Sequence, residues 1–357
     1  MSTGDFHGSV FVLALYDVCE EISLSELRPL IGGQLLTPSF KHTTPGYVRF
    51  ERPPVIESLE PVALESGEQF TGTIQYYDYG VVGVLLRLRY SGSWTELKKL
   101  ASRWISSLVF DELTTRLVRK RLQTVQAALC KTYENWLSED YYIFQMDASE
   151  QPAQELLRDR GEDISQLING ETVPLAAPET QEALQGSMSY YPNDLVVVGW
   201  NAALIYDAEA AADTTIRIFE YANSQLLQFR HYDELLTREL ATAYRFLESR
   251  RGLLAGWRMR PGATRLRTVL LEITELTERT NNALKFVGDM FSARLYKLCA
   301  SKIGVVDYQA LVQDKLHTAD DLYDFMIEKF HQARGFLLES VVVVILIIEL
   351  FYLFRGK

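Results

Sequence analysis

The sequence predicts an α+β protein: an N-terminal mixed α/β domain, a long antiparallel three-helix stalk of coiled-coil type, and a C-terminal transmembrane helix. Three observations support this prediction. Strand-like and helical patterns alternate up to residue 206, helical periodicity dominates from residue 207, and the chain ends in an apolar run. We therefore expect an α/β domain over 1–206, a helical stalk over 207–335 and a membrane anchor over 336–354.

The α/β domain is predicted from short runs separated by turn residues. Ser23-Leu-Ser-Glu26 has the spacing of a capping box, which predicts a short helix to Ile31. Tyr79-Gly80 separates two runs rich in Thr, Tyr, Val and Leu, as expected for paired strands. We expect strands over 10–16, 46–50, 71–78, 81–89, 141–145 and 195–206, and helices over 94–110 and 111–137.

The interval 146–194 differs in composition from the rest of the domain. It carries ten acidic residues against Arg158 and Arg160, a net charge of −8, and is interrupted by four prolines. We interpret it as a long, partly ordered acidic insertion.

The stalk is predicted from helical periodicity over 213–249, over 264–302, and from 305 into the anchor. In the third helix, apolar positions alternate steps of four and three, as in a coiled-coil seam. This seam contains Val312, Leu316, Ala319, Tyr323, Met326, Phe330, Ala333 and Leu337. The seam packs either within the chain or against a partner.

The C-terminal run from Phe336 to Phe354 is long enough to cross a membrane. As a helix it measures about 28 Å at 1.5 Å per residue, close to the roughly 30 Å hydrocarbon core. Fifteen of its nineteen residues are Leu, Ile, Val or Phe, which favours insertion over the alternative of a buried core helix. The residues that we expect to span the membrane include Phe336, Leu338, Val341, Val344, Ile345, Ile348, Leu350 and Phe354.

Two carboxylates lie inside this run. Glu339 lies six residues before the midpoint, Ile345, and Glu349 lies four residues after it. Intramembrane acids are functional candidates, so we expect either polar contacts in an oligomer or snorkelling to opposite interfaces. Beyond Glu349, Phe351, Tyr352 and Phe354 fit an interfacial aromatic belt, followed by the basic residues Arg355 and Lys357.

An arginine-rich loop is predicted to face the same membrane. If the three helices are antiparallel neighbours, the connection between the first and second lies at the end from which the third enters the bilayer. Basic residues around an apolar, Trp-bearing tip attract anionic headgroups and satisfy the positive-inside rule; the alternative is a solvated turn whose arginines pair with acidic neighbours. The predicted surface residues are Arg250, Arg251, Trp257, Arg258, Arg260 and Arg265.

Composition limits the functional classes. The net charge of −11 argues against nonspecific nucleic-acid binding. Three widely spaced cysteines suggest neither a disulfide framework nor a zinc site, which fits a reducing compartment. The N-terminus lacks the features of a signal peptide or mitochondrial presequence. We therefore expect a single-pass protein whose soluble part lies in the cytoplasm, in a bacterial inner membrane or, alternatively, a mitochondrial inner membrane.

The common catalytic motifs are absent from the sequence. It contains no GxGxxG after a strand, no GxxxxGK[ST], no HExxH and no GxSxG. The five histidines are scattered, and a solvated position is their usual fate. We therefore predict no catalytic residue, no metal ligand and no cofactor, and expect that the protein is not an enzyme.

Several segments resemble the required-for-meiotic-nuclear-division (Rmd) family, a family of unknown function. The resemblance rests on three long helices ending in Leu338-Glu339 and an aliphatic run that closes on Ile348-Glu349, on Tyr76-Tyr-Asp-Tyr-Gly-Val-Val82, and on Ile22-Ser-Leu-Ser-Glu-Leu27. The segment Gly252 to Pro261 departs from the family's Asp-x-Pro-x-aromatic-Trp pattern. The resemblance implies a membrane-anchored protein without established catalysis, with mitochondrial relatives implicated in supporting translation at the inner membrane.

The sequence thus predicts a tail-anchored scaffold or tether that forms homo-oligomers, contacts anionic headgroups and binds a protein partner. The resemblance adds the translation machinery as a candidate partner. A second hypothesis is a regulatory subunit whose α/β domain senses a small molecule, and a third is an unrecognised enzyme.

Overall fold

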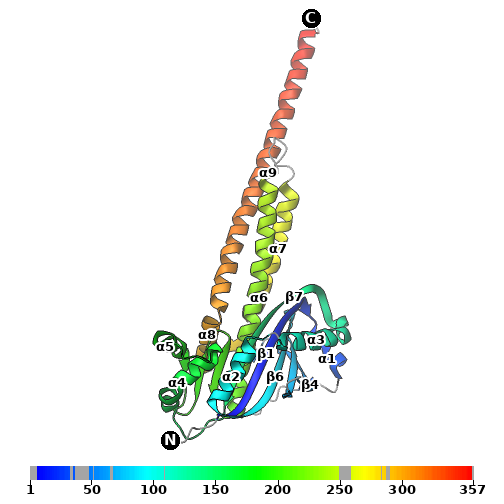
Figure 1. Ribbon diagram of the computed structural model, residues 1–357. Helices are drawn as coiled ribbons and strands as arrows, with labels where there is room; N and C mark the ends of the chain where they lie inside the picture. Colours follow the sequence, from blue (N-terminus) through cyan, green and yellow to red (C-terminus); the bar gives the residue numbers. More distant parts are fainter. Residues whose placement is uncertain are drawn as a thin grey trace. The chain divides into compact units, whose positions relative to one another are not determined.

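The computed structural model describes residues 6–32, 35–36, 48–50, 52–64, 67–107, 109–248, 259–282, 284–286 and 290–355. The chain divides into two compact units, Met1–Phe229 with Arg279–Tyr308 and Arg230–Glu278 with Gln309–Lys357. The long helices α6 (Glu209–Glu248) and α9 (Val305–Arg355) contribute to both units. The predicted α+β fold class is confirmed: a mixed sheet domain precedes long helices and an apolar C-terminal helix (Figure 1).

A nine-stranded sheet, counted over the described residues, forms the centre of the first unit. The strand order is β2-β4-β5-β6-β1-β7-β10-β9-β8. Neighbours are antiparallel except β7 and β10, which are parallel. The strands are β1 (Phe6–Ile22), β2 (Leu35–Leu36), β4 (Val55–Ala63), β5 (Gln69–Tyr76), β6 (Val81–Gly92), β7 (Leu129–Met146), β8 (Ser187–Met188), β9 (Leu195–Val198) and β10 (Ala202–Tyr206); β3 (Val48–Phe50) pairs separately with β11 (Leu284–Phe286).

Helices cover both faces of the sheet, which explains why β1 is apolar along most of its length. Val10 and Val12 share a core with residues of α2 (Trp94–Ile105), α3 (Val109–Thr124) and α4 (Ala153–Asn169). Because side chains alternate along a strand, Leu13 points to the other face, where its neighbour Tyr141 stacks on Phe219 of α6 at 5.4 Å between ring centroids. The first half of α6 therefore covers the face opposite α2 and α3.

Local signals set the turns and helix ends. The predicted break between β5 and β6 is a turn in which Gly80 has φ +84°, and a Cβ there would lie 1.8 Å from the carbonyl oxygen of Cys19. The predicted helix after Ser23 is α1 (Leu24–Ile31), but Ser23 makes no side-chain capping bond. A capping box forms instead at Ser93 and Glu96, at the start of α2.

The predicted helix over 111–137 was wrong in its second half. Helix α3 ends at Thr124, a 3-10 turn covers Gln126–Ala128, and the chain then enters the long strand β7. The first part of β7 pairs with the end of β1, from Cys19↔Thr132 to Ile22↔Leu129. This long-range pairing, which a local pattern does not report, decides the conformation.

The segment 146–194 is not a partly ordered insertion. Helix α4 buries Leu156, Ile164 and Leu167 in the sheet's core, and α5 (Ala177–Gln185) and β8 follow it. Most of its acidic residues are exposed, and the half-buried Asp163 carboxylate accepts from Lys98 Nζ of α2 at 2.7 Å. The segment is part of the connection that carries the chain from β7 to the parallel strand β10.

The boundary between the units also differs from the predicted 206/207 division. Residues 209–229 of α6 and helix α8 (Met290–Lys302) belong to the unit that contains the sheet. The reason is burial, because nearly every residue from 215 to 229 is buried, as expected for a helix packed on a sheet. The predicted single helix over 264–302 is instead α7 (Met259–Asn282), β11 and α8.

The second unit is a bundle built from the second half of α6, most of α7, and α9. Its core contains Leu240, Ala243, Ala263, Leu266, Ala319, Leu322 and Met326. The third-helix seam is buried at Val312, Ala319 and Met326, so up to this point it packs within the chain. Lys315 Nζ donates to Thr237 Oγ1 at 2.6 Å and pairs with Asp233, which fixes α9 beside α6.

Candidate membrane anchor

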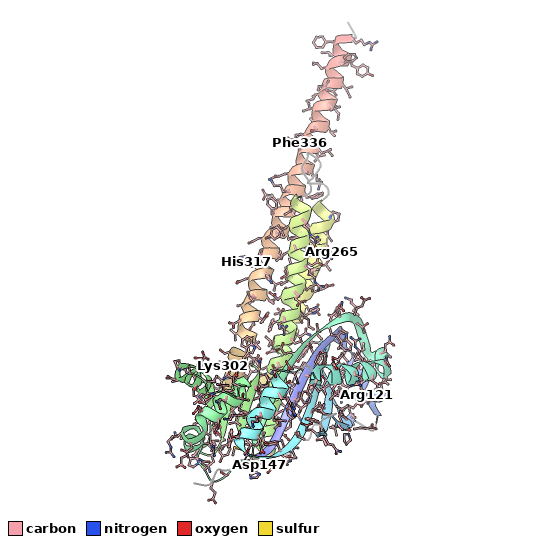
Figure 2. The ribbon with its side chains drawn as sticks, in the orientation of Figure 1. Arg121, Asp147, Arg265, Lys302, His317 and Phe336 are labelled. Atoms are coloured by element: carbon pink, nitrogen blue, oxygen red, sulfur yellow. The ribbon has the colours of Figure 1, made fainter. Side chains whose placement is uncertain are left out.

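The last part of α9 is an exposed apolar helix. From Phe336 onward the side chains project from the helix without packing on another described element (Figure 2). The most apolar part of α9 has a mean hydropathy of 2.5 and is 0% buried. The predicted spanning residues are between 48% (Val341) and 75% (Phe354) exposed: Phe336, Leu338, Val341, Val344, Ile345, Ile348, Leu350 and Phe354.

This exposure is inconsistent with a buried core helix. A core helix of this composition would be covered by the chain's own elements, as Val312, Ala319 and Met326 earlier in α9 are. The residues from Phe336 onward are instead exposed. Burying one such aliphatic side chain is worth about 1.5–3 kcal/mol, so a continuous run of them favours an apolar surrounding. Length, composition and exposure together fit a single-pass membrane anchor.

The two acids predicted to lie in the membrane, Glu339 and Glu349, are on this exposed helix. Within the described residues, neither Glu339 nor Glu349 has a salt-bridge partner from its own chain. Ser340 Oγ, the other polar group near the start of the run, donates to the backbone oxygen of Phe336 at 2.8 Å. If the run spans a membrane, these two carboxylates are the ionisable groups placed in its hydrocarbon core.

The far end of the span carries the predicted aromatic and basic residues. The Arg355 guanidinium lies 5.8 Å from the centroid of the Phe351 ring, and Tyr352 is 72% exposed. An aromatic belt next to a cationic side chain suits the level of the headgroups.

The structure describes little of the predicted membrane-surface set. Arg250, Arg251, Trp257 and Arg258 lie outside the described residues, and Arg260 lies in α7 without a described side chain. Arg265, labelled in Figure 2, donates two hydrogen bonds to Glu239 of α6, at 3.0 and 2.7 Å.

The described ends of α6 and α7 that flank the arginine-rich connection lie at the same end of the bundle. Helix α6 ends and α7 begins at the end of the bundle from which α9 continues alone (Figure 1). Arg265 pairs with Glu239 of α6 within the bundle, and the remaining predicted surface residues stay candidates for lipid contact.

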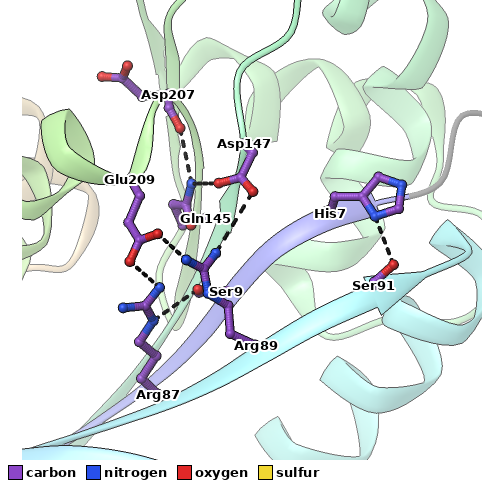
Figure 3. Close-up of polar contacts among 9 residues, drawn as sticks. All are labelled: His7, Ser9, Arg87, Arg89, Ser91, Gln145, Asp147, Asp207 and Glu209. Atoms are coloured by element: carbon purple, nitrogen blue, oxygen red, sulfur yellow. Dashed lines mark hydrogen bonds and ion pairs between the residues drawn. The ribbon is translucent and has the colours of Figure 1, made fainter.

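A polar cluster at the start of α6 is not indicated by any sequence motif (Figure 3). Arg87 and Arg89, at alternate positions of β6, both bind the Glu209 carboxylate in the first turn of α6. Although burial acts in the opposite direction, the two arginines lower the pKa of Glu209. The cluster fixes the beginning of α6 against β6, an interior strand of the sheet.

Further contacts complete this cluster. Arg87 Nε donates to Ser9 Oγ at 3.0 Å, and the buried Gln145 amide donates to Asp147 Oδ1 at 2.9 Å and to the Asp207 backbone oxygen at 3.0 Å. Burial raises the pKa of Asp207. Because both arginines are held by carboxylates of the same chain, the cluster is arranged for structural support.

A second polar group lies inside the core. Tyr76 Oη donates to Glu57 Oε2 at 3.0 Å, and Arg121 of α3 pairs with the same carboxylate. The Glu57 side chain is 1% exposed, whereas that of Arg121 is 26% exposed. Arg121 therefore compensates a carboxylate that is almost fully removed from water.

Among the described residues, no group of three or more His, Cys, Asp or Glu side chains is arranged to hold a metal ion. His7 Nδ1 lies 2.8 Å from Ser91 Oγ at the surface. A surface hollow of about 730 Å³ lies beside α5, and another of about 500 Å³ lies on the outer face of α3. Both are open to solvent.

The fold and the apolar helix define a class: an α+β protein with a candidate single-pass C-terminal anchor. The chain belongs to the family described as "Uncharacterized protein MJ0711, N-terminal domain", whose model matches residues 7–213. The match covers the sheet domain and ends in the first turns of α6, so the bundle and the anchor lie outside it.

A relative from Methanocaldococcus jannaschii (strain ATCC 43067 / DSM 2661 / JAL-1 / JCM 10045 / NBRC 100440), named "Uncharacterized protein MJ0711", is 20% identical over 187 residues. The alignment covers 52% of this chain and 57% of the relative. No solved structure matches the chain. These matches show a family of unknown function, and the resemblance to the Rmd family stays a prediction.

Proposed function

We propose that the protein is a tail-anchored scaffold or tether, which holds a non-catalytic α/β domain at the cytoplasmic face of a membrane. The observation that carries this proposal is the exposed apolar end of α9, which needs an apolar surrounding. The sheet domain supports it as well, because it has its own core and is a separate compact unit. The proposed membrane is a bacterial inner membrane or, alternatively, a mitochondrial one.

The partner is best found with the complete protein. Purification from membranes in mild detergent, followed by mass spectrometry, should recover a membrane complex or ribosomes, the latter suggested by the Rmd resemblance. A bound small molecule would instead favour a sensing subunit, and recovery of the protein alone in repeated purifications would contradict the tether.

The arginine-rich connection gives a prediction about lipid binding. Replacing Arg250, Arg251, Arg258 and Arg260 with Ala should weaken binding of the protein truncated after Gly335 to anionic vesicles, because each basic residue near the surface contributes about 1 kcal/mol. Arg265→Ala is the matched control and should change binding little, because Glu239 already holds that guanidinium. Vesicle cosedimentation measures both, and equal affinities for the fourfold variant and the parent would refute the lipid contact.

We also propose that the anchors associate as a homo-oligomer through the intramembrane acids. Parallel anchors place Glu349 of each copy at the same depth, where hydrogen bonds between helices contribute about 1–2 kcal/mol. Glu349→Leu should therefore reduce crosslinked oligomer in membranes, whereas Glu349→Gln should retain it. An unchanged oligomer in the Leu variant would leave snorkelling as the role of this carboxylate.

A further inference from the structure

The first half of α6 presents polar side chains to the interior, which is unusual for a helix packed on a sheet. The buried polar residues on this part of the helix are Thr215, Glu220, Asn223, Ser224, Gln225 and Gln228. A helix that covers a sheet normally buries an apolar stripe. Here the contact also depends on hydrogen bonds, and we call this group of contacts the polar seam.

The polar seam contains directional contacts along its length. Tyr79 Oη and Ser224 Oγ are 2.7 Å apart, and Gln228 Nε2 donates to Asp17 Oδ1 of β1 at 2.9 Å. Gln225 binds Tyr296 of α8 through its side-chain oxygen. Such bonds are strong inside a protein when every partner is in place, and an unpaired group there is destabilising.

Glu220 is the carboxyl group at the centre of this seam. It is 3% exposed, and the Gln75 side-chain amide of β5 donates to its Oε1. The Gln75 oxygen in turn accepts from Tyr77 Oη at 3.1 Å. Burial raises the pKa of Glu220 to about 7, although the charge of Arg217 and the Gln75 bond act in the opposite direction.

Two tyrosines beside the seam stay neutral near neutral pH. Burial raises the pKa of Tyr77 and of Tyr79 well above the usual value for tyrosine, so both stay neutral. Within the described part of the chain, the titratable groups near Glu220 and along the seam are Asp213, Arg217 and Tyr221 on α6, Asp17 on β1, Tyr77, Asp78 and Tyr79 after β5, and Tyr296 on α8.

We propose that Glu220 is a proton-operated latch between α6 and the sheet. With its proton bound, the carboxyl group is neutral and α6 is closed on β5. When the proton passes to water, a carboxylate remains in a buried site, and opening of residues 216–228 of α6 hydrates it. Because the same helix continues through Arg230–Glu248 of the bundle, the latch acts on an element shared by both units.

The direction of the pH effect follows from linkage. The carboxyl binds its proton more tightly in the closed state, with a pKa of about 7, than in water, where the usual value is 4.5. The contribution of Glu220 to the stability of the closed seam is therefore fully present below pH 4.5. It is lost as pH rises through the folded-state pKa of about 7. Between about pH 5.5 and pH 8, these two values give roughly 30-fold more opening.

Hydrogen–deuterium exchange on the full-length protein in detergent tests the latch. After correction for intrinsic exchange, peptides from residues 216–228 should open roughly 30-fold more at about pH 8 than at about pH 5.5. Glu220→Gln, which has nearly the same shape but cannot ionise, should abolish this difference. Glu234→Gln is the matched control, because Glu234 is exposed on the same helix, and it should retain the difference.

Infrared spectroscopy of the same samples reports the proton itself. The wild-type protein should show a protonated-carboxyl band that fades as pH rises and is absent from Glu220→Gln. Exchange in residues 216–228 that is the same at both pH values, or a pH dependence that persists in Glu220→Gln, would overturn the proposal. Neither measurement depends on membrane insertion, so the latch and the anchor can fail separately.

Discussion

Replacing both Ile345 and Ile348 with Arg is expected to release the protein from membranes into the soluble fraction. The two positions lie at and near the middle of the exposed apolar run. Each arginine near the bilayer centre disfavours insertion by about 3 kcal/mol, so together they offset most of the several kcal/mol that the aliphatic residues contribute. Fractionation with alkaline extraction of membranes measures the change.

The matched control places the same two charges earlier on the same helix. Leu311 and His317 are exposed positions of α9 within the bundle, so Leu311→Arg with His317→Arg should leave the protein in the membrane fraction. Retention of the Ile345/Ile348 variant after alkaline extraction would show that the C-terminal run is not the anchor.

Replacing Arg121 with Met is expected to destabilise the sheet domain by about 3 kcal/mol or more. The substitution leaves the Glu57 carboxylate, whose side chain is 1% exposed, without its cation. Glu57→Gln combined with Arg121→Met should recover most of the loss, because the amide oxygen still accepts from Tyr76 while no buried charge remains. Urea unfolding of the full-length protein in detergent, followed by circular dichroism, measures each free energy.

The control for this second prediction is Arg116→Met, which removes an exposed arginine from the same helix. It should change the free energy of unfolding by about 0.5 kcal/mol at most. If Arg121→Met unfolds at the same urea concentration as this control, then the Glu57–Arg121 pair contributes little to stability.

The exposed apolar helix at the C-terminus was predictable because its signal is compositional. A membrane span requires only a continuous apolar run of sufficient length, and Phe336 to Phe354 provides it without reference to any other part of the chain. The turn at Gly80 was predictable for a similar reason, since a positive φ strongly favours glycine.

The polar seam was not predictable from the sequence. Glu220, Ser224 and Gln228 have the composition of a solvated helical face, and their hydrogen-bond partners Gln75, Tyr79 and Asp17 lie far away in the chain. Local periodicity cannot show that a polar face is buried. The same limit applies to Arg265, which binds Glu239 of the preceding helix.

The sequence by itself determined the fold class, the apolar C-terminal helix and the helices whose apolar stripes repeat locally, because these depend on composition and short spacing. Only the tertiary structure decided that 129–137 is a strand, that α4 belongs to the sheet's core and that the first half of α6 closes on β5. These features arise from pairing and burial between distant segments, whose free energy no local pattern contains.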